Sequence, residues 1–137
     1  MVAKTLFGFE DILANELTQL GAIEVEKGIR NVSFVGDKGF MYKANLGIRT
    51  AIKILKPIKT FKVIREEDLY KNVKSMKWEN YLKATGSLAV DATVHNSVFT
   101  HSQYTALKTK DAIVDRFREI DGTRPDVDLR FPDVKIN

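Results

Sequence analysis

Eight lysine and arginine residues follow one another between residues 38 and 65 with no aspartate or glutamate among them. This basic run consists of Lys38, Lys43, Arg49, Lys53, Lys56, Lys59, Lys62 and Arg65. Cations gathered in this way suit the phosphates of a nucleic acid, because each neutralised phosphate releases counterions and adds to the affinity. We expect Lys53, Lys56, Lys59 and Lys62 to contact phosphates. The chain as a whole carries a net charge of only +4.

The alternative interpretation is a solvated surface that acidic residues balance in space. Glu10, Asp11 and Glu16 are the acids that could do so from outside the run. Charge alone does not separate RNA from DNA, since both present the same phosphates.

A second group of candidate residues lies on a predicted long helix from Ser102 to Arg118. At about 100° per residue, the helix has a mainly apolar face. That face consists of Ala106, Lys110, Ile113, Val114 and Phe117. A separate polar ridge consists of Tyr104, Lys108, Asp111 and Asp115. Lys110 must lay its methylenes along the core and place its ammonium at an edge, where it either closes the helix–sheet seam or meets an anion.

The start of this helix is a further candidate for anion binding. Free backbone N–H groups and the helix dipole favour an anion at such a terminus, and capping by Ser102 is compatible with that role. The phenol of Tyr104 could meet a base or a phosphate, or bond to a neighbouring acid. The predicted second contact region consists of His101, Ser102, Gln103, Tyr104, Lys108 and Lys110.

Other chemistry finds little support in the sequence. No glycine pair of the Gly-x-Gly type follows a strand, so no dinucleotide or S-adenosylmethionine loop can be placed. There are no cysteines, which excludes disulfides and thiolate metal sites. His95 and His101 make a poor metal site without a placed carboxylate. The acids Asp126, Asp128 and Asp133 fit local pairing in a turn better than magnesium binding, and no acid–base pair points to a small self-contained enzyme.

Helical and alternating apolar patterns predict an α+β protein. Two strand–helix–strand units occupy the first part of the chain, with Gly21 ending the first helix and Asp37 capping the second. From Ala51 to Val63 we expect an extended segment that breaks at Pro57. A helix from Glu66 to Ser75, a turn around Trp78, a strand from Ser87 to His95 with alternate residues on one face, and the long helix follow. We expect Trp78 in the core rather than stacked on a base.

Composition is that of a compact protein without a membrane anchor. The chain has 137 residues, of which 44% are hydrophobic, enough for one core or for two small ones. No apolar run of about 18 residues could span a membrane. The start of the chain lacks the apolar core of a secretory signal. We therefore expect a cytoplasmic protein.

Several short sequence motifs resemble those of one known family. Ser102-Gln103-Tyr104, Lys108 and the stretch Lys110 to Asp115 are similar to the THUMP domain of bacterial ribosomal-RNA guanine-N2 methyltransferases, which often carry the older name N6-adenine-specific DNA methylase. The opening from Phe7 to Leu17 resembles the start of that family, as does Asp68-Leu69-Tyr70 followed by Trp78. The similarity runs through essentially the whole chain, but covers only the front part of such an enzyme.

The resemblance implies a ferredoxin-like N-terminal domain, residues 1–63, followed by an α/β THUMP domain, residues 64–137, truncated at its C-terminal end. It implies an RNA-binding module for structured RNA, ribosomal RNA above all, which works with a methyltransferase domain absent from this chain. That missing domain would use S-adenosylmethionine, and we expect no cofactor in this chain. The alternative is a protein–protein interaction domain whose basic strand docks an acidic partner or the catalytic domain.

Overall fold

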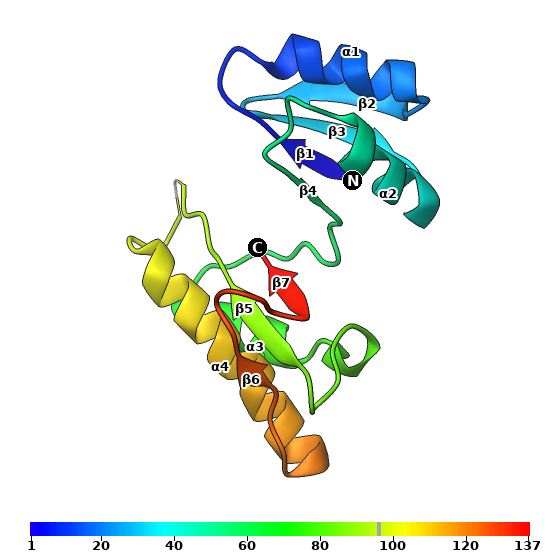
Figure 1. Cartoon of the computed structure of the whole chain (residues 1–137). Helices are drawn as coiled ribbons and strands as arrows, with labels where there is room; N and C mark the ends of the chain where they lie inside the picture. Colours follow the sequence, from blue (N-terminus) through cyan, green and yellow to red (C-terminus); the bar gives the residue numbers. More distant parts are fainter. Residues whose placement is uncertain (96) are drawn as a thin grey trace. The chain divides into compact units, whose positions relative to one another are not determined.

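The chain forms two compact units, Met1–Thr60 and Phe61–Asn137. A computed structural model describes residues 1–95 and 97–137 (Figure 1). Each unit has its own sheet and its own hydrophobic core. Each therefore presents a surface of its own to a ligand.

The first unit alternates strands and helices in the predicted order. Its elements are β1 (Val2–Lys4), α1 (Glu10–Leu20), β2 (Ile23–Gly28), β3 (Asn31–Val35), α2 (Lys38–Gly47) and β4 (Lys53–Leu55). The strands form an antiparallel sheet in the order β2-β3-β1-β4, which confirms the ferredoxin-like prediction. β4 lies at an edge and ends before Pro57, which has no N–H to give to a ladder.

Residues next to the helices explain where α1 ends and where α2 begins. Gly21 has a φ of 100° and caps the C-terminus of α1 in the left-handed region, as predicted. Asp37 caps α2, because its carboxylate accepts a hydrogen bond of 2.6 Å from the backbone N–H of Phe40. The helices cover a core made of Ala3, Leu13, Leu17, Ala22, Val32 and Phe34.

The second unit is built on a parallel sheet of three short strands. Its elements are α3 (Glu66–Lys74), the 3₁₀ turn η1 (Trp78–Asn80), β5 (Ser87–Val90), α4 (Ser102–Asp121), β6 (Asp126–Val127) and β7 (Val134–Ile136). The sheet order is β6-β5-β7, with β5 in the centre. Helices α3 and α4 lie side by side, and α4 also packs on β5 (Figure 1).

Trp78 lies in the core of the second unit, as predicted. Its side chain is 2% exposed, and its indole N–H donates a hydrogen bond of 2.7 Å to the carbonyl of Val73. It packs among Leu69, Val73, Met76, Leu82, Leu88, Phe99, Ala112, Ile113 and Phe117. A base cannot stack on a ring buried in this way.

Two predictions for this unit were wrong. The strand that begins at Ser87 ends at Val90 rather than at His95, and its neighbours Leu88 and Ala89 are both buried. A parallel strand covered on both faces has no reason to alternate. Ser102 does not cap the long helix, because it is the first helical residue and His101 holds the cap position without a side-chain capping bond. No helix within the described ranges is long and apolar enough to cross a bilayer.

Candidate nucleic-acid interface

The basic run is exposed, and the ammonium of Lys43 donates a hydrogen bond of 2.7 Å to the carbonyl of Leu20. All eight of its lysine and arginine residues have exposed side chains. Within residues 1–95 and 97–137, none of the eight forms an ion pair with a carboxylate. The run therefore keeps its positive charge available for a ligand.

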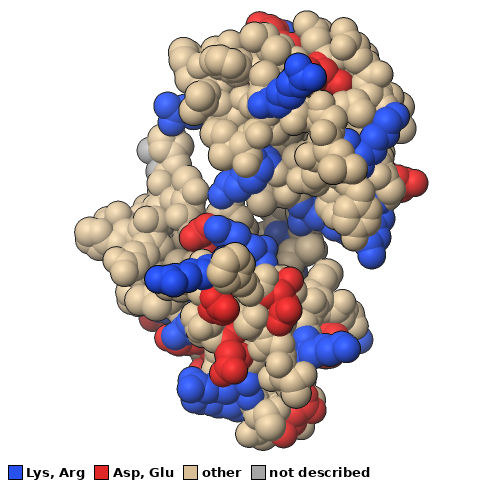
Figure 2. Space-filling view, viewed as in Figure 1, with Lys and Arg blue, Asp and Glu red and all other residues tan. Residues whose placement is uncertain are grey.

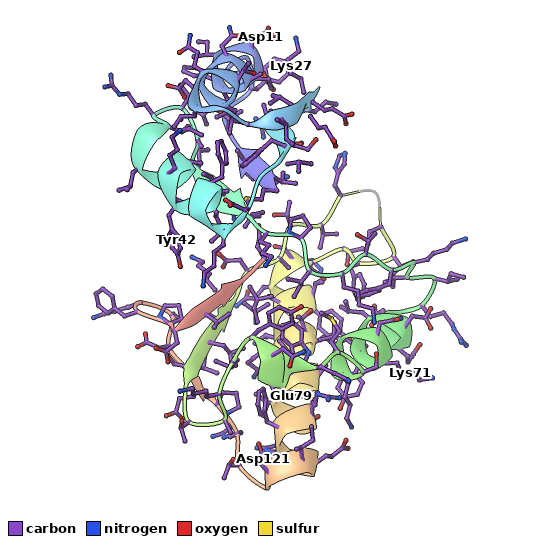
Figure 3. All side chains as sticks on the ribbon, turned by 90° about the vertical axis from the view of Figure 1, so that its right-hand side faces the viewer. Asp11, Lys27, Tyr42, Lys71, Glu79 and Asp121 are labelled. Carbon is purple, nitrogen blue, oxygen red and sulfur yellow. The ribbon has the colours of Figure 1, made fainter. Side chains whose placement is uncertain are left out.

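The acids that could have balanced the run have other partners. Glu10 accepts hydrogen bonds from the backbone N–H groups of Arg30 (2.9 Å) and Gly8 (2.7 Å), and the bond from Arg30 is the main reason why the pKa of Glu10 is lowered. Asp11 forms an ion pair of 2.6 Å with Lys27, which lies outside the run (Figure 3). These two acids are therefore tied within the first unit.

Glu16 joins α1 to the loop before β4. Its carboxylate accepts hydrogen bonds from the hydroxyl (2.6 Å) and the backbone N–H (3.2 Å) of Thr50. Burial opposes ionisation of Glu16, but the bonds from Thr50 and the backbone N–H of Arg49 outweigh it, and the pKa is lowered. The charge of Glu16 also attracts the charge of Arg49, a member of the run, while its hydrogen bonds hold the loop in place.

Five of the exposed cations recur at every third position. They are Lys53, Lys56, Lys59, Lys62 and Arg65, and we call them the lysine row. From residue 56 to residue 63 the chain forms no helix, strand or turn. Lys53, Lys56 and Lys59 belong to the first unit, and Lys62 and Arg65 belong to the second.

The second predicted contact region surrounds two hollows at the N-terminal half of α4. His101, Ser102, Gln103 and Tyr104 line a shallow hollow of about 540 Å³. Tyr104 also lines a neighbouring cleft of about 600 Å³, together with Lys108 and Lys110. The structure thus brings the predicted residues of α4 to adjoining surfaces.

The lysines of this region differ from those of the basic run, because each has an acidic partner. The ammonium of Lys108 lies 3.3 Å from the Tyr104 hydroxyl and 3.6 Å from Glu66, and these groups, Tyr104 first, raise the pKa of Lys108. The Tyr104 hydroxyl itself donates to Glu66 at 2.9 Å. Lys110 pairs with Asp111 at 2.8 Å. A phosphate at either lysine would have to compete with a carboxylate.

The cleft also contains arginines that the sequence analysis did not select. Arg118 and Arg124 line it beside Tyr70. Arg118 lies two turns beyond Lys110 on the same helix, so helical periodicity could have found it. Arg124 reaches the cleft only because the chain returns from α4 to β6, and no local pattern predicts that return.

Charge is distributed differently over the two units. On the face shown in Figure 2, lysine, arginine and acidic side chains are interspersed over the Phe61–Asn137 unit, whereas most coloured atoms of the Met1–Thr60 unit are basic. The ion pairs of the second unit are Lys74–Glu119, Lys108–Glu66, Lys110–Asp111, Arg116–Glu79, Arg118–Asp115 and Lys135–Asp91. We infer that charge in the second unit serves mostly its own structure.

The strongest of these pairs joins α4 to η1. The guanidinium of Arg116 donates two hydrogen bonds to Glu79, at 2.6 and 3.0 Å, and a third of 3.3 Å to the carbonyl of Lys74. The side-chain bonds from Arg116 are the main reason why the pKa of Glu79 falls from 4.5 to about 2. This pair fixes the helix that carries the second contact region.

We expect Glu79→Gln to destabilise the second unit at neutral pH. Because the folded state lowers the pKa of Glu79, its ionised form stabilises the fold above about pH 4.5, and this contribution is lost as the pH falls toward 2. Urea unfolding should therefore separate the variant from the parent at pH 7 and bring the two together in acid. Glu67→Gln, at an exposed carboxylate outside the ion pairs described, is the control. A constant difference between Glu79→Gln and the parent from pH 7 to pH 2 would contradict this assignment.

The acidic residues near the C-terminal strands hold loops. Asp128 accepts hydrogen bonds from the backbone N–H groups of Arg130 (2.8 Å) and Phe131 (3.0 Å), and Asp133 accepts from the backbone N–H of Ser87 (2.8 Å). The local-turn interpretation holds for Asp128, whose partners are backbone N–H groups of its own turn, but not for Asp133, whose partner Ser87 lies 46 residues earlier in the chain. Over the described part of the chain, no group of three or more potential ligands could hold a metal ion.

Known sequences match both units. Residues 55–137 match the model of the THUMP domain, and residues 1–55 match the RlmL ferredoxin-like domain. The ribosomal RNA large subunit methyltransferase K/L of Syntrophotalea carbinolica is 42% identical over 95% of this chain, which spans 18% of that protein. The protein of the same name from Cellvibrio japonicus is also 42% identical over 95% of this chain, which spans 17% of it. The chain therefore spans less than a fifth of the length of these two relatives.

Solved structures show the same fold. A predicted N6-adenine-specific DNA methylase from Listeria monocytogenes is 27% identical, with a TM-score of 0.71 over 86% of this chain and 31% of that one. SMU.472, solved in complex with SAH, is 29% identical, with a TM-score of 0.78 over 96% of this chain and 34% of that one. The matched domains, their order and the folds agree, and the chain belongs to the THUMP domain family, with an RlmL ferredoxin-like domain in front of its THUMP domain.

Proposed function

We propose that this chain is the RNA-binding part of an S-adenosylmethionine-dependent RNA methyltransferase that acts on ribosomal RNA in the cytoplasm. The observation that supports it best is the basic run, whose eight cations are exposed and form no ion pair with a carboxylate of the described residues. The family supports it independently, since relatives that share most of this chain are named ribosomal RNA methyltransferases.

Within this proposal, the two contact regions have different roles. Lys53, Lys56, Lys59 and Lys62 supply most of the phosphate attraction, because no carboxylate has to be displaced. The α4 region of His101, Ser102, Gln103, Tyr104, Lys108 and Lys110 makes contacts that depend on shape, because its charges are already paired. The chain positions the RNA, and a methyltransferase domain carries out the reaction.

S-adenosylmethionine would supply the methyl group, but the residues of this chain do not fit it. The eight glycines of the chain include no pair of the Gly-x-Gly type that could form a cofactor loop after a strand. We therefore derive no catalytic step from these residues. The SAH bound to SMU.472 supports the cofactor for the whole enzyme only.

Filter binding to a structured RNA from the large ribosomal subunit tests the proposal. If four to eight phosphates are neutralised, the plot of log affinity against log salt should have a slope between about −3 and −7. Polyglutamate, which carries charge without phosphates or bases, is the control competitor. Weak binding with a shallow slope, or equal competition by polyglutamate, would favour a domain that docks an acidic protein.

A further inference from the structure

Exposed apolar side chains gather at one end of the sheet in the first unit. Lys4, the last residue of β1, pairs with Asn31 at the start of β3 and with Lys53 at the start of β4. The loop after β1, the turn between β2 and β3, and the residues before β4 therefore meet at this end. Their apolar members, each at least 59% exposed, are Leu6, Phe7, Ile29 and Ile52, and we call this surface the apolar end.

The loop that carries Phe7 is held firmly. The backbone N–H of Phe9 donates to the carbonyl of Leu6 at 3.2 Å, and Gly8 between them has a φ of 86°, as a type II β-turn requires. The Glu10 carboxylate accepts hydrogen bonds from the backbone N–H of Gly8 and from that of Arg30, which lies in the turn between β2 and β3. The backbone around Phe7 is therefore fixed while its ring is 73% exposed.

Three cations lie next to the apolar end along the chain. Lys4 ends β1, Arg30 lies in the turn between β2 and β3, and Lys53 begins β4, and none of the three forms an ion pair with a carboxylate of the described residues. The nearby charge of Glu10 is already engaged by two backbone N–H groups. The surface thus suits a ligand that is both flat and apolar on one side and negatively charged on the other.

We infer that the apolar end binds unpaired nucleotides of the RNA, with a base stacked on Phe7 and phosphates held by Arg30 and Lys53. An exposed aromatic ring beside free cations is a common arrangement for single-stranded RNA, because every base has a face that stacks. Lys53 also begins the lysine row, and Lys56 and Lys59 follow it in the same unit, so a strand held by these three lysines has its next contacts here. The inference rests on the proposed function and adds a preference for a single-stranded segment.

Two RNA probes separate this inference from general RNA binding. One is a blunt duplex, and the other is the same duplex with a single-stranded oligoadenosine extension. Phe7→Ala should lower affinity for the extended probe about tenfold, a typical loss for one stacked base, and leave the blunt duplex unaffected. Phe7→Trp should restore binding. Phe131→Ala, which removes an 85% exposed ring from the second unit, is the matched control.

A 2-aminopurine in the extension reports stacking directly. Its emission should be quenched by the parent chain and by Phe7→Trp, and not by Phe7→Ala. If Phe7→Ala binds the extended probe as tightly as the parent chain does, or loses the same affinity for both probes, the inference is overturned while RNA binding stands. If the parent chain binds neither probe, the proposed function itself fails. A melting curve confirms that each variant is folded.

Discussion

Changing Lys53, Lys56 and Lys59 together to alanine is expected to lower the affinity for structured RNA about a hundredfold at about 0.1 M salt. Each of these lysines is exposed and forms no ion pair within the part of the chain that the structure describes, so each can neutralise one phosphate at little cost. Three lost contacts should also make the log–log salt slope shallower by about 2 to 3. Filter binding over a range of salt concentrations measures both effects.

The matched control removes the same amount of charge from lysines that have acidic partners. These are Lys27, Lys74 and Lys135, which pair with Asp11, Glu119 and Asp91. If net charge alone determined binding, both triple variants would lose affinity equally. Equal losses, or an unchanged salt slope in the first variant, would show that the basic run is not the phosphate-binding surface.

Trp78→Ala is expected to destabilise the second unit by about 3–5 kcal/mol, the usual cost of deleting a large buried aromatic side chain. The change would empty a site among the core residues and leave the carbonyl of Val73 without its indole donor. A domain of this size is stable by only about 5–15 kcal/mol in total. Urea unfolding followed by far-ultraviolet circular dichroism should show an early transition from this unit.

Trp78→Phe separates packing from the hydrogen bond. It keeps most of the ring volume, so we expect a smaller loss than for alanine. Tyr81→Phe is the control, because Tyr81 contacts Trp78 edge to face while remaining 46% exposed. A Trp78→Ala variant that unfolds at the same urea concentration as the parent would show that this core does not depend on the indole.

The parts of the fold that could be predicted are those that neighbouring residues determine. Gly21 and Asp37 mark helix ends through bonds within a few residues, and the ferredoxin-like order followed from them and from helical periodicity. The length of β5 could not be predicted, since it depends on pairing with β6 and β7 far along the chain. For the same reason the two-residue strand β6 has no local signal.

In the candidate site, too, some features could be predicted from neighbouring residues and others depend on contacts between distant segments. The basic run can be read directly from neighbouring residues of the sequence, and in the structure its cations form no ion pair with a described carboxylate. The partner of Lys108 could not be foreseen, because Glu66 lies on another helix and comes close only through the packing of α3 on α4. The apolar end depends on the register of three strands, so sequence reasoning missed Phe7 as a candidate contact.

Trp78 is the only tryptophan of the chain, and it lies in the second unit. Intrinsic tryptophan emission is therefore a label-free reporter of that unit, while the ferredoxin-like unit is silent at the same wavelengths. Thermal unfolding can be followed by tryptophan emission and by circular dichroism. If the two signals give different midpoint temperatures, the difference measures how independently the two domains unfold.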